Sequence, residues 1–326
     1  MREFARPRIV SSKCLEFEAC RYNGGRITSD EVRQLFPHAD FIPVCPEVEI
    51  GLGIPRSPIR IVNPEDRRLV QPETGRDLTS DMKRFLDKFL APLKKVGPDG
   101  IDGFILKYRS PSCGLKNVKV FADAESKTPA GKGAGFFGAA VRERFPGLAV
   151  EDEGRLKDYR IREAFLTRLF TLSSFRQTQA SGQMKDLVRF QSENKLLLMA
   201  HAEKHMRALG KIVANPDKRP VDELMSTYRE GLEQALASPP RPTSCINVLM
   251  HALGYFKKQL SSEEKSFFLA ALEDFRGKRL PLSVPVGIMR SHIVRFAEAY
   301  LGSQTFFEPY PAGLVSVTDS GKGRDL

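Results

Sequence analysis

The chain has 326 residues, enough for two domains with a core each. Hydrophobic residues make up 41% and charged residues 28%, a balance that is typical of a globular protein and excludes a disordered or membrane-embedded chain. The formal net charge of +11 favours a polyanionic partner such as a nucleic acid.

The first residues, MREFARPRIV, lack the apolar core of a signal peptide, and no apolar run approaches the roughly 20 residues that span a bilayer. We therefore expect a cytoplasmic protein with no membrane partner. Its five cysteines do not indicate a disulfide framework, because the cytosol keeps thiols reduced. Metal binding or catalysis is the better interpretation of these thiols.

Short apolar runs alternate with helical stretches in residues 1–155. Residues 41–44 and 103–106 indicate strands, and residues 81–95 between them indicate a helix. This alternation is typical of βαβ units. We predict an α/β domain with a mostly parallel, Rossmann-like sheet.

Residues 160–326 form a second predicted domain, which is all α. Gly210 is expected to end one helix, and Ser261 with Glu264 makes a capping box at the start of another. The polar residues 318–326 are expected to fray. The amphipathic segments cover residues 161–171, 181–209, 220–237, 242–259, 261–276 and 286–301.

Three cysteines share a local context. Cys14, Cys45 and Cys113 each follow an apolar run that indicates a strand. Loops at the carboxyl ends of parallel strands meet at one edge of a sheet, so the three thiols can meet in space. Three thiolates without a fourth equivalent suit an iron–sulfur cluster with one open iron. The alternative is that each cysteine is a small buried hydrophobic residue, because the chain has no CxxC pair.

The other two cysteines lie in different settings. Cys20 is a candidate fourth ligand or resolving thiol, but its position before a turn favours a spectator role. Cys245 lies in a predicted helix and is expected to be a core residue.

Three segments resemble the motifs of the TudS-like thiouracil desulfidase family: SSKCLEFEACRYNGG, PVCPEVEIGLGIPRSPIRIV and DGFILKYRSPSCG. The resemblance covers nearly all of residues 8–155. It implies that Cys14, Cys45 and Cys113 hold a [4Fe–4S] cluster, that the open iron binds a thiocarbonyl sulfur, and that the base leaves in its oxo form. The chain departs from the usual motif at Lys13, where a small residue is common, and at Asn23, where Asp is common.

The same resemblance implies catalytic roles for Glu47 as the general base and for Ser110 as the catalytic serine. Read from the residues alone, a solvated loop position or a capping role explains Glu47 better than catalysis does. Ser112 is a second candidate for the catalytic hydroxyl, or it shapes the turn beside Pro111.

The second half has its own relatives. QSENKLLLMAHAEKHMRALG, GYFKKQLSSEEKSFF and LPLSVPVGIMRSHIVRF resemble the YbgA-like helical domain. Chains that join both halves resemble the RudS type of tRNA 4-thiouridine desulfidase, which implies thiolated tRNA as partner and substrate. Residues 1–155 carry 26 Lys and Arg against 22 Asp and Glu, and residues 156–326 carry 25 against 18, so the second part is the more basic.

Basic residues supply candidate contacts to nucleic acid, with an ordinary solvated surface as the alternative. Beside the predicted site these are Lys107 and Arg109, and in the helical half they are Lys257 and Lys258. The glycines of residues 130–138 predict either a phosphate-binding nest or a simple helix-entry turn.

Histidines offer a weaker metal signal. His201 and His205 have the i, i+4 spacing of a metal pair on a helix, but no HExxH pattern accompanies them. His251 lies on another predicted helix. Exposed helical histidines are the alternative interpretation.

Three functions are compatible with these features. The first is a [4Fe–4S]-dependent hydrolytic desulfidase of 4-thiouridine in tRNA. The second is a desulfidase of free thiouracil or thiolated nucleotides, and the third is a non-catalytic RNA-binding module with a structural cluster or zinc. The sequence leaves the thiolation position and the oligomeric state open.

Overall fold

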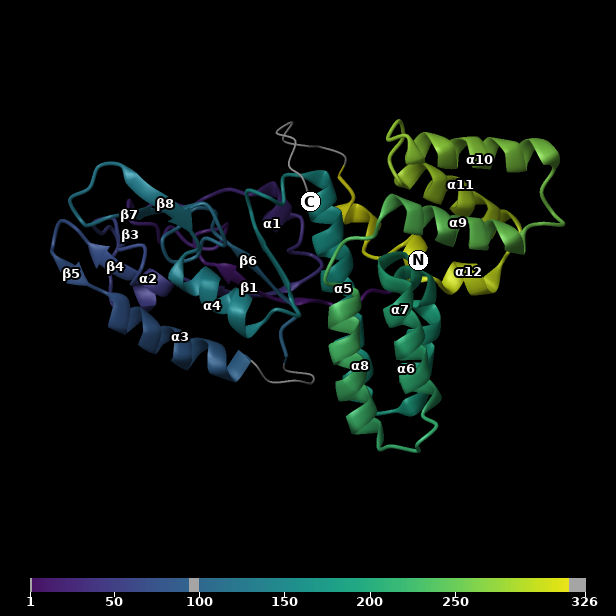
Figure 1. The fold of residues 1–326 in the computed structure, drawn as a ribbon, viewed down its shortest axis with the longest axis horizontal. Helices are drawn as coiled ribbons and strands as arrows, with labels where there is room; N and C mark the ends of the chain where they lie inside the picture. The colour runs from purple at the N-terminus through teal and green to yellow at the C-terminus, as the bar shows by residue number, and fades with distance from the viewer. Residues whose placement is uncertain (1, 94–99, 317–326) are drawn as a thin grey trace. The chain divides into compact units, whose positions relative to one another are not determined.

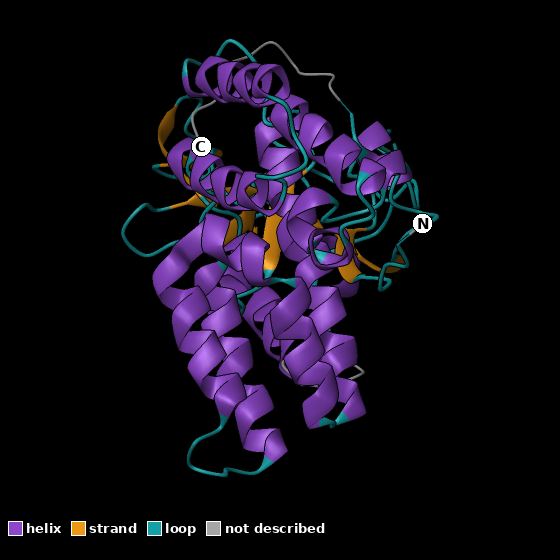
Figure 2. Ribbon diagram, turned by 90° about the vertical axis from the view of Figure 1, so that its right-hand side faces the viewer, coloured by secondary structure: helices purple, strands orange, loops and turns teal. Residues whose placement is uncertain are grey.

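The computed structural model describes residues 2–93 and 100–316. The chain forms two compact units, one made of residues 1–177 with 310–326 and the other of residues 178–309 (Figure 1). Within the described residues, every strand belongs to the first unit, and the second contains helices and loops (Figure 2). The predicted combination of an α/β region with a helical region is confirmed.

A four-stranded parallel sheet forms the centre of the first unit. Its strand order is β2-β1-β6-β9, and every pairing is parallel. Ile9 of the central strand β1 lies opposite Phe41 on one side and Gly103 on the other. The predicted strands at 41–44 and 103–106 are confirmed. The bounds are β1 Arg8–Ser12, β2 Asp40–Val44, β6 Gly103–Leu106 and β9 Ala149–Asp152.

A second sheet was not expected from the sequence. Its order is β5-β4-β3-β7-β8, and only the β3 and β7 pair is parallel. The glycine-rich residues 130–133, predicted to form a nest or a turn, lie in the exposed strand β8 paired with β7. The bounds are β3 Arg60–Val62, β4 Arg68–Gln71, β5 Arg76–Asp77, β7 Val118–Phe121 and β8 Pro129–Gly133.

Within the described residues, five α-helices and a 3-10 helix at Ala312–Leu314 complete the first unit. In α3, Met82, Leu86 and Leu90 recur every four residues and are buried, which gives the helix one apolar face. This helix matches the prediction at 81–95, of which residues 94 and 95 lie outside the described residues, as do the polar residues 318–326. The bounds are α1 Asp30–Arg33, α2 Pro46–Glu49, α3 Thr79–Leu93, α4 Phe136–Arg144 and α5 Tyr159–Ser181.

Helix α5 places the unit boundary later than the expected division between residues 155 and 160. Its Leu166 and Leu169 belong to the same buried cluster as Ile9 of the sheet. The Arg176 guanidinium on α5 donates from Nε to both carboxylate oxygens of the fully buried Asp102, at 3.0 and 3.1 Å. Because α5 completes the core of the α/β unit, the compact units divide after Gln177.

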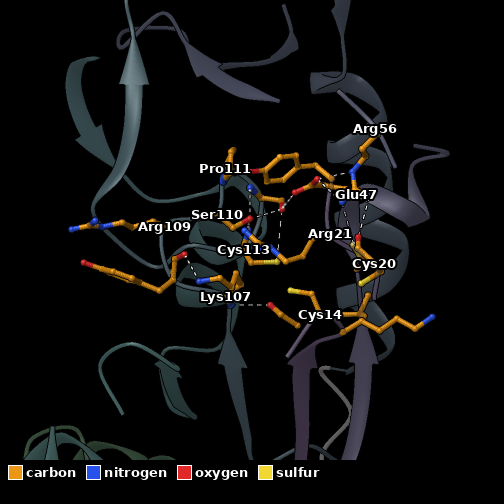
Figure 3. A pocket seen from close by; sticks show the side chains of 17 residues that line it. Cys14, Cys20, Arg21, Glu47, Arg56, Lys107, Arg109, Ser110, Pro111 and Cys113 are labelled. Carbon is orange, nitrogen blue, oxygen red and sulfur yellow. Dashed lines mark hydrogen bonds and ion pairs between the residues drawn. The ribbon is translucent and has the colours of Figure 1, made fainter. Parts of the chain in front are cut away.

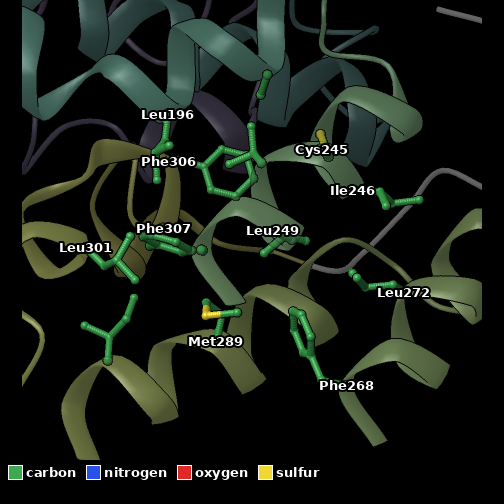
Figure 4. Packing of buried hydrophobic residues seen from close by; sticks show 14 of the residues in the cluster. Leu196, Cys245, Ile246, Leu249, Phe268, Leu272, Met289, Leu301, Phe306 and Phe307 are labelled. Carbon is green, nitrogen blue, oxygen red and sulfur yellow. The ribbon is translucent and has the colours of Figure 1, made fainter. Parts of the chain in front are cut away.

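The second unit is a helical bundle around its own apolar core (Figure 4). Leu249, Phe268 and Met289 come from three different helices and are fully buried there. Cys245 is a core residue of the same cluster, as predicted. The bounds are α6 Met184–Glu193, α7 Lys195–Ala214, α8 Val221–Ala235, α9 Pro242–Tyr255, α10 Ser262–Arg276, α11 Ser283–Arg295 and α12 Ala299–Ser303.

The bundle confirms the predicted capping box and corrects the bounds of three predicted helices, of which the segment predicted at 286–301 is two helices, α11 and α12. The Ser261 side chain accepts from the Glu264 N–H, and the Glu264 carboxylate accepts from the Ser261 N–H. The predicted helix at 181–209 is two helices that meet at Asn194, and Gly210 lies inside α7. The helix continues to Ala214 because Asn215 adopts the left-handed conformation that ends it. No helix of the described residues has the length and apolar character needed to cross a bilayer.

Candidate active site

A cavity of about 360 Å³ lies where strands β1, β2 and β6 end (Figure 3). Cys14 follows β1 by two residues, Cys45 follows β2 directly, and Cys113 lies in the loop after β6. All three thiols line the cavity, and all three residues are at most 9% exposed. The parallel sheet thus brings together cysteines separated by 31 and 68 positions in the chain.

A fourth thiol lines the same cavity. Cys20 is fully buried and clusters with Cys14 and Cys45, so its place before a turn does not keep it away from the cavity, and its role as a spectator stays a prediction. The turn folds the chain back, since the Arg21 N–H donates to the Gly25 carbonyl at 3.2 Å. Asn23 Oδ1 accepts from the Gly25 N–H at 3.1 Å, so the amide orients this turn in place of the usual carboxylate.

The environment disfavours the charged form of Cys14, Cys45 and Cys113, whereas a hydrogen bond with the Cys14 thiol lowers the pKa of Cys20 to about 7. Burial raises the pKa of Cys45 to about 12 and that of Cys113 to about 11. A hydrogen bond with the Cys20 thiol, followed by burial, raises the pKa of Cys14. Metal binding at this site must therefore release protons from the thiols.

The donor set fits a polynuclear cluster. In the described part of the chain, no three His, Cys, Asp or Glu side chains converge on a single point suited to one metal ion. The cysteines are instead distributed around a cavity, and their buried thiols are the ligands that iron–sulfur clusters require.

Glu47 and the two serines form one hydrogen-bonded chain. Glu47 lies on α2, two residues after Cys45, and faces the cavity. The Ser112 hydroxyl donates to Glu47 Oε1 at 2.7 Å. Because that proton is already used, the contact of 2.9 Å between the two serine hydroxyls has Ser110 as its donor. Ser110 Oγ also accepts from the N–H of Cys113 at 3.1 Å.

Arg56 is a site residue that the sequence analysis did not single out. Its guanidinium donates from Nε and Nη2 to Glu47 Oε2, at 2.9 and 2.7 Å. Nη1 donates to the carbonyls of Cys20 and Gly53, at 3.0 and 3.1 Å. The Arg56 side chain is only 5% exposed, so this contact fixes the carboxylate in place. Its only sequence signal is the final arginine of the CPEVEIGLGIPR motif.

Helix α4 holds the loop that carries Ser110, Ser112 and Cys113. The N–H groups of Phe137 and Gly138 donate to the Ser112 carbonyl at 2.8 and 3.2 Å. These amides are therefore occupied by the loop and do not form the phosphate nest considered from the glycine pattern. A Cβ atom on Gly138 would lie 2.4 Å from the Gly114 carbonyl oxygen, so glycine is required for this close approach.

The basic residues predicted to contact nucleic acid lie in two places. Lys107 lines the cavity, but its ammonium pairs with Glu153 and donates to the Tyr108 carbonyl at 2.9 Å. Arg109 also lines the cavity and is exposed. Lys257 and Lys258 are exposed in the turn that follows α9 of the helical unit.

The histidines do not form the metal pair considered from their spacing. Ala202, next to His201, has non-helical backbone angles, so the i, i+4 geometry toward His205 is broken. His201 Nδ1 lies 2.9 Å from the Ser238 carbonyl oxygen. His251 is exposed on α9.

Comparisons with known proteins match two separate parts of the chain. The profile of the 2-thiouracil desulfurase family matches residues 9–153. The profile of DUF1722, described as a protein of unknown function, matches residues 195–311.

Individual relatives cover each part. The uncharacterized protein YbgA of Escherichia coli K12 is 28% identical over 164 residues, which are 50% of this chain and 96% of YbgA. The uncharacterized protein YbbK of Bacillus subtilis 168 is 31% identical over 112 residues, which are 32% of this chain and 72% of YbbK. Among solved structures, the [4Fe-4S]-dependent thiouracil desulfidase TudS is similar at 28% identity, over 46% of this chain and 93% of TudS, with a TM-score of 0.38.

The desulfurase match contains every residue that lines the cavity. The chain therefore belongs, through residues 9–153, to the 2-thiouracil desulfurase family of desulfidases, and it joins to this a DUF1722 domain in residues 195–311.

Proposed function

We propose that this protein removes sulfur from 4-thiouridine in tRNA, leaving uridine and releasing sulfide. The observation that carries the proposal is the joining of a desulfurase site to a DUF1722 domain in one chain. A desulfidase acting only on a free base needs no second domain, whereas a large substrate needs a platform outside the cavity. The resemblance of the joined chain to tRNA 4-thiouridine desulfidases supports this substrate.

The proposed cofactor is a [4Fe–4S] cluster held by Cys14, Cys45 and Cys113. When bound, it supplies a soft Lewis acid that prefers a thiocarbonyl sulfur to oxygen and polarises the attached carbon. Cys20 lies beside two of these ligands and is buried, so it shields them from water.

The protein's own residues supply the proton path for hydrolysis. A water that attacks the thiocarbonyl carbon gives its proton to Ser110 Oγ, whose own proton passes to Ser112 and then to Glu47 Oε1. The water oxygen becomes the new carbonyl oxygen, its second proton passes to the departing sulfur, which leaves as hydrosulfide, and Glu47 then releases the first proton to solvent. No net electron transfer occurs in this balance.

Both units carry a net positive charge, as binding to an RNA backbone requires. Residues 178–309 carry 18 Lys and Arg against 14 Asp and Glu, an excess of four, which leaves an excess of seven in the α/β unit, so with this boundary the helical unit is not the more basic part. Part of the basic excess counted after residue 155 lies on α5 of the α/β unit, where Arg162 and Arg176 make buried contacts. The exposed pair Lys257 and Lys258 belongs to the helical unit and is available to phosphates.

The direct test is the full chain, reconstituted anaerobically with iron and sulfide, incubated with thiolated tRNA and analysed for nucleosides. We expect 4-thiouridine to disappear as uridine and sulfide appear in equal amounts. Turnover of free thiouracil but not of tRNA would instead favour the free-base desulfidase. A chain cut at residue 160 is a poor test, because the cut removes α5 from the core of the first unit.

The proposed role of the helical unit in tRNA binding is tested by replacing Lys257 and Lys258 together by Ala. Affinity for all tRNAs should fall alike, and the log–log dependence on salt should flatten by about 0.7 to 0.9 per lost phosphate contact. Activity on a free thiolated base serves as the control and should be unchanged. A tRNA affinity that does not depend on salt would exclude this role for the pair.

A further inference from the structure

More cationic side chains line the cavity than are needed to balance the charge of the Glu47 carboxylate. Five of the described lining residues are Lys or Arg, whereas Glu47 is the single acidic one. Three of the five are paired with carboxylates: Lys13 with Glu18, Arg56 with Glu47 and Lys107 with Glu153. Within the described residues, no carboxylate pairs with the other two, Arg21 and Arg109. These two guanidinium groups are available to an anion.

Each of the two arginines lies over the ring of a neighbouring tyrosine. The Arg109 Cζ atom is 4.8 Å from the centroid of the Tyr108 ring, and the Arg21 Cζ atom is 5.5 Å from that of Tyr22. Both tyrosines line the cavity, and Tyr22 is 42% exposed. Stacking on a ring limits the orientation of a guanidinium while leaving its N–H groups available.

The backbone presents both arginines from tight turns. Arg109 has a φ of +58°, a left-handed conformation that is uncommon for a residue with a side chain. The Tyr108 N–H donates to Glu153 Oε2 at 2.7 Å and anchors this turn. Arg21 opens the turn that Gly24, with a φ of +70°, closes. The two loops carry Arg21 and Arg109 as well as Cys20 and Cys113.

We propose that Arg21 and Arg109 bind the phosphate groups of the nucleotide whose base enters the cavity. The planar guanidinium offers several N–H donors that match phosphate oxygens, and phosphate contacts fix the register of a nucleic acid without reading its bases. This inference rests on the proposed action on a nucleotide. It adds that the α/β unit itself distinguishes a phosphorylated substrate from a free base.

The experiment compares Arg21→Ala, Arg109→Ala and the corresponding Lys variants on four substrates. These are 4-thiouracil, 4-thiouridine, 4-thiouridine 5′-monophosphate and thiolated tRNA. For each Ala variant, we expect kcat/KM on tRNA to fall about tenfold, through a higher KM, while kcat/KM on 4-thiouracil stays unchanged. A loss of this size is what one hydrogen bond to a charged group contributes to binding. The Lys variants should recover part of the loss, because they keep the charge without the guanidinium fork.

Two further readouts separate a phosphate contact from a structural effect. Iron content should equal that of the wild type, and the salt slope of tRNA binding should flatten by about one for each variant. Arg142→Ala is the matched control, because Arg142 is exposed on α4 and does not line the cavity.

The outcomes distinguish this inference from the proposed function. An equal loss on all four substrates, or wild-type kinetics on both phosphorylated substrates, would overturn the phosphate site. Selective loss on the monophosphate, in a protein that does not act on tRNA, would support the phosphate site and overturn the tRNA assignment.

Discussion

The Ser112 hydroxyl and the Glu47 carboxylate are joined by a hydrogen bond of 2.7 Å across 65 positions of the chain. Ser112 comes from the loop after β6, and Glu47 comes from the short helix after β2. Because Ser112 donates to Glu47, Ser110 is the outer member of the chain of hydroxyls. The bond therefore gives the two serines different positions in proton transfer.

The first prediction concerns Glu47. Glu47→Gln should keep iron content at the wild-type level and lower kcat roughly 10² to 10⁴-fold, because an amide keeps the shape but cannot take the proton. Ser112→Ala should cause a loss of similar size, since it removes the hydroxyl that links Ser110 to Glu47. Single-turnover rates under anaerobic conditions measure both effects.

Ser110→Ala serves as the comparison. If the chain of hydroxyls carries the proton, the double variant Ser110→Ala with Ser112→Ala should be no slower than the slower single variant. Additive losses would mean that the two hydroxyls act separately.

The second prediction concerns Arg56, which acts through Glu47 as a positioning residue. Arg56→Ala should lower kcat and also destabilise the fold by about 3–5 kcal/mol, because it leaves the part-buried Glu47 carboxylate without its partner. Arg56→Lys should be less affected. Added guanidinium ion should restore part of the activity to the Ala variant only.

A purely structural role for Arg56 would give a different result. The activity of the Ala variant would then follow its folded fraction and would not respond to guanidinium. Thermal unfolding measured beside the rates separates the two cases.

The third prediction concerns the ligand set. Cys14→Ala, Cys45→Ala and Cys113→Ala should each abolish the cluster, while Cys20→Ala keeps it. Cys245→Ala is the matched control, because Cys245 is buried in the helical core. Iron content and visible absorbance after anaerobic reconstitution are the measurements. Full iron in any of the first three variants, with loss in Cys20→Ala, would move Cys20 into the ligand set.

The fourth prediction concerns the pH dependence of stability. Burial, followed by the neighbouring Glu151, raises the pKa of Asp152 from 3.8 to about 6, and its Oδ2 has no hydrogen-bond partner among the described residues. The folded state therefore holds this proton more tightly than the unfolded state. Its contribution to stability is complete below pH 4 and is lost as pH rises to 6, by about 2–3 kcal/mol.

Asp152→Asn should remove this dependence and give a more stable protein above pH 6. The free energy of unfolding in urea, measured at intervals from pH 4 to 7.5, should show the two curves separating across that range. Asp66→Asn, on an exposed loop, is the control and should follow the wild type. Parallel curves for Asp152→Asn would contradict the raised pKa.

Much of this protein follows from local patterns in its sequence. The strands that precede Cys14, Cys45 and Cys113 are visible as apolar runs. Because the carboxyl ends of parallel strands lie at the same edge of the sheet, the cysteines that follow them meet at that edge. The capping box of Ser261 and Glu264 is equally local, because both hydrogen bonds lie within one turn of helix.

Other features depend on contacts between distant segments, which a local pattern does not contain. Arg56 acts on Glu47 because a loop returns to α2, and Cys20 reaches the cavity because a turn folds it inward. Helix α5 looks like the start of the helical half, yet the Asp102 carboxylate and the apolar face of the sheet hold it in the α/β unit. The sequence determined which reactive side chains the site contains. Tertiary packing decided which other side chains hold them in place, because these partners lie far apart in the chain and the loops between them leave no local pattern.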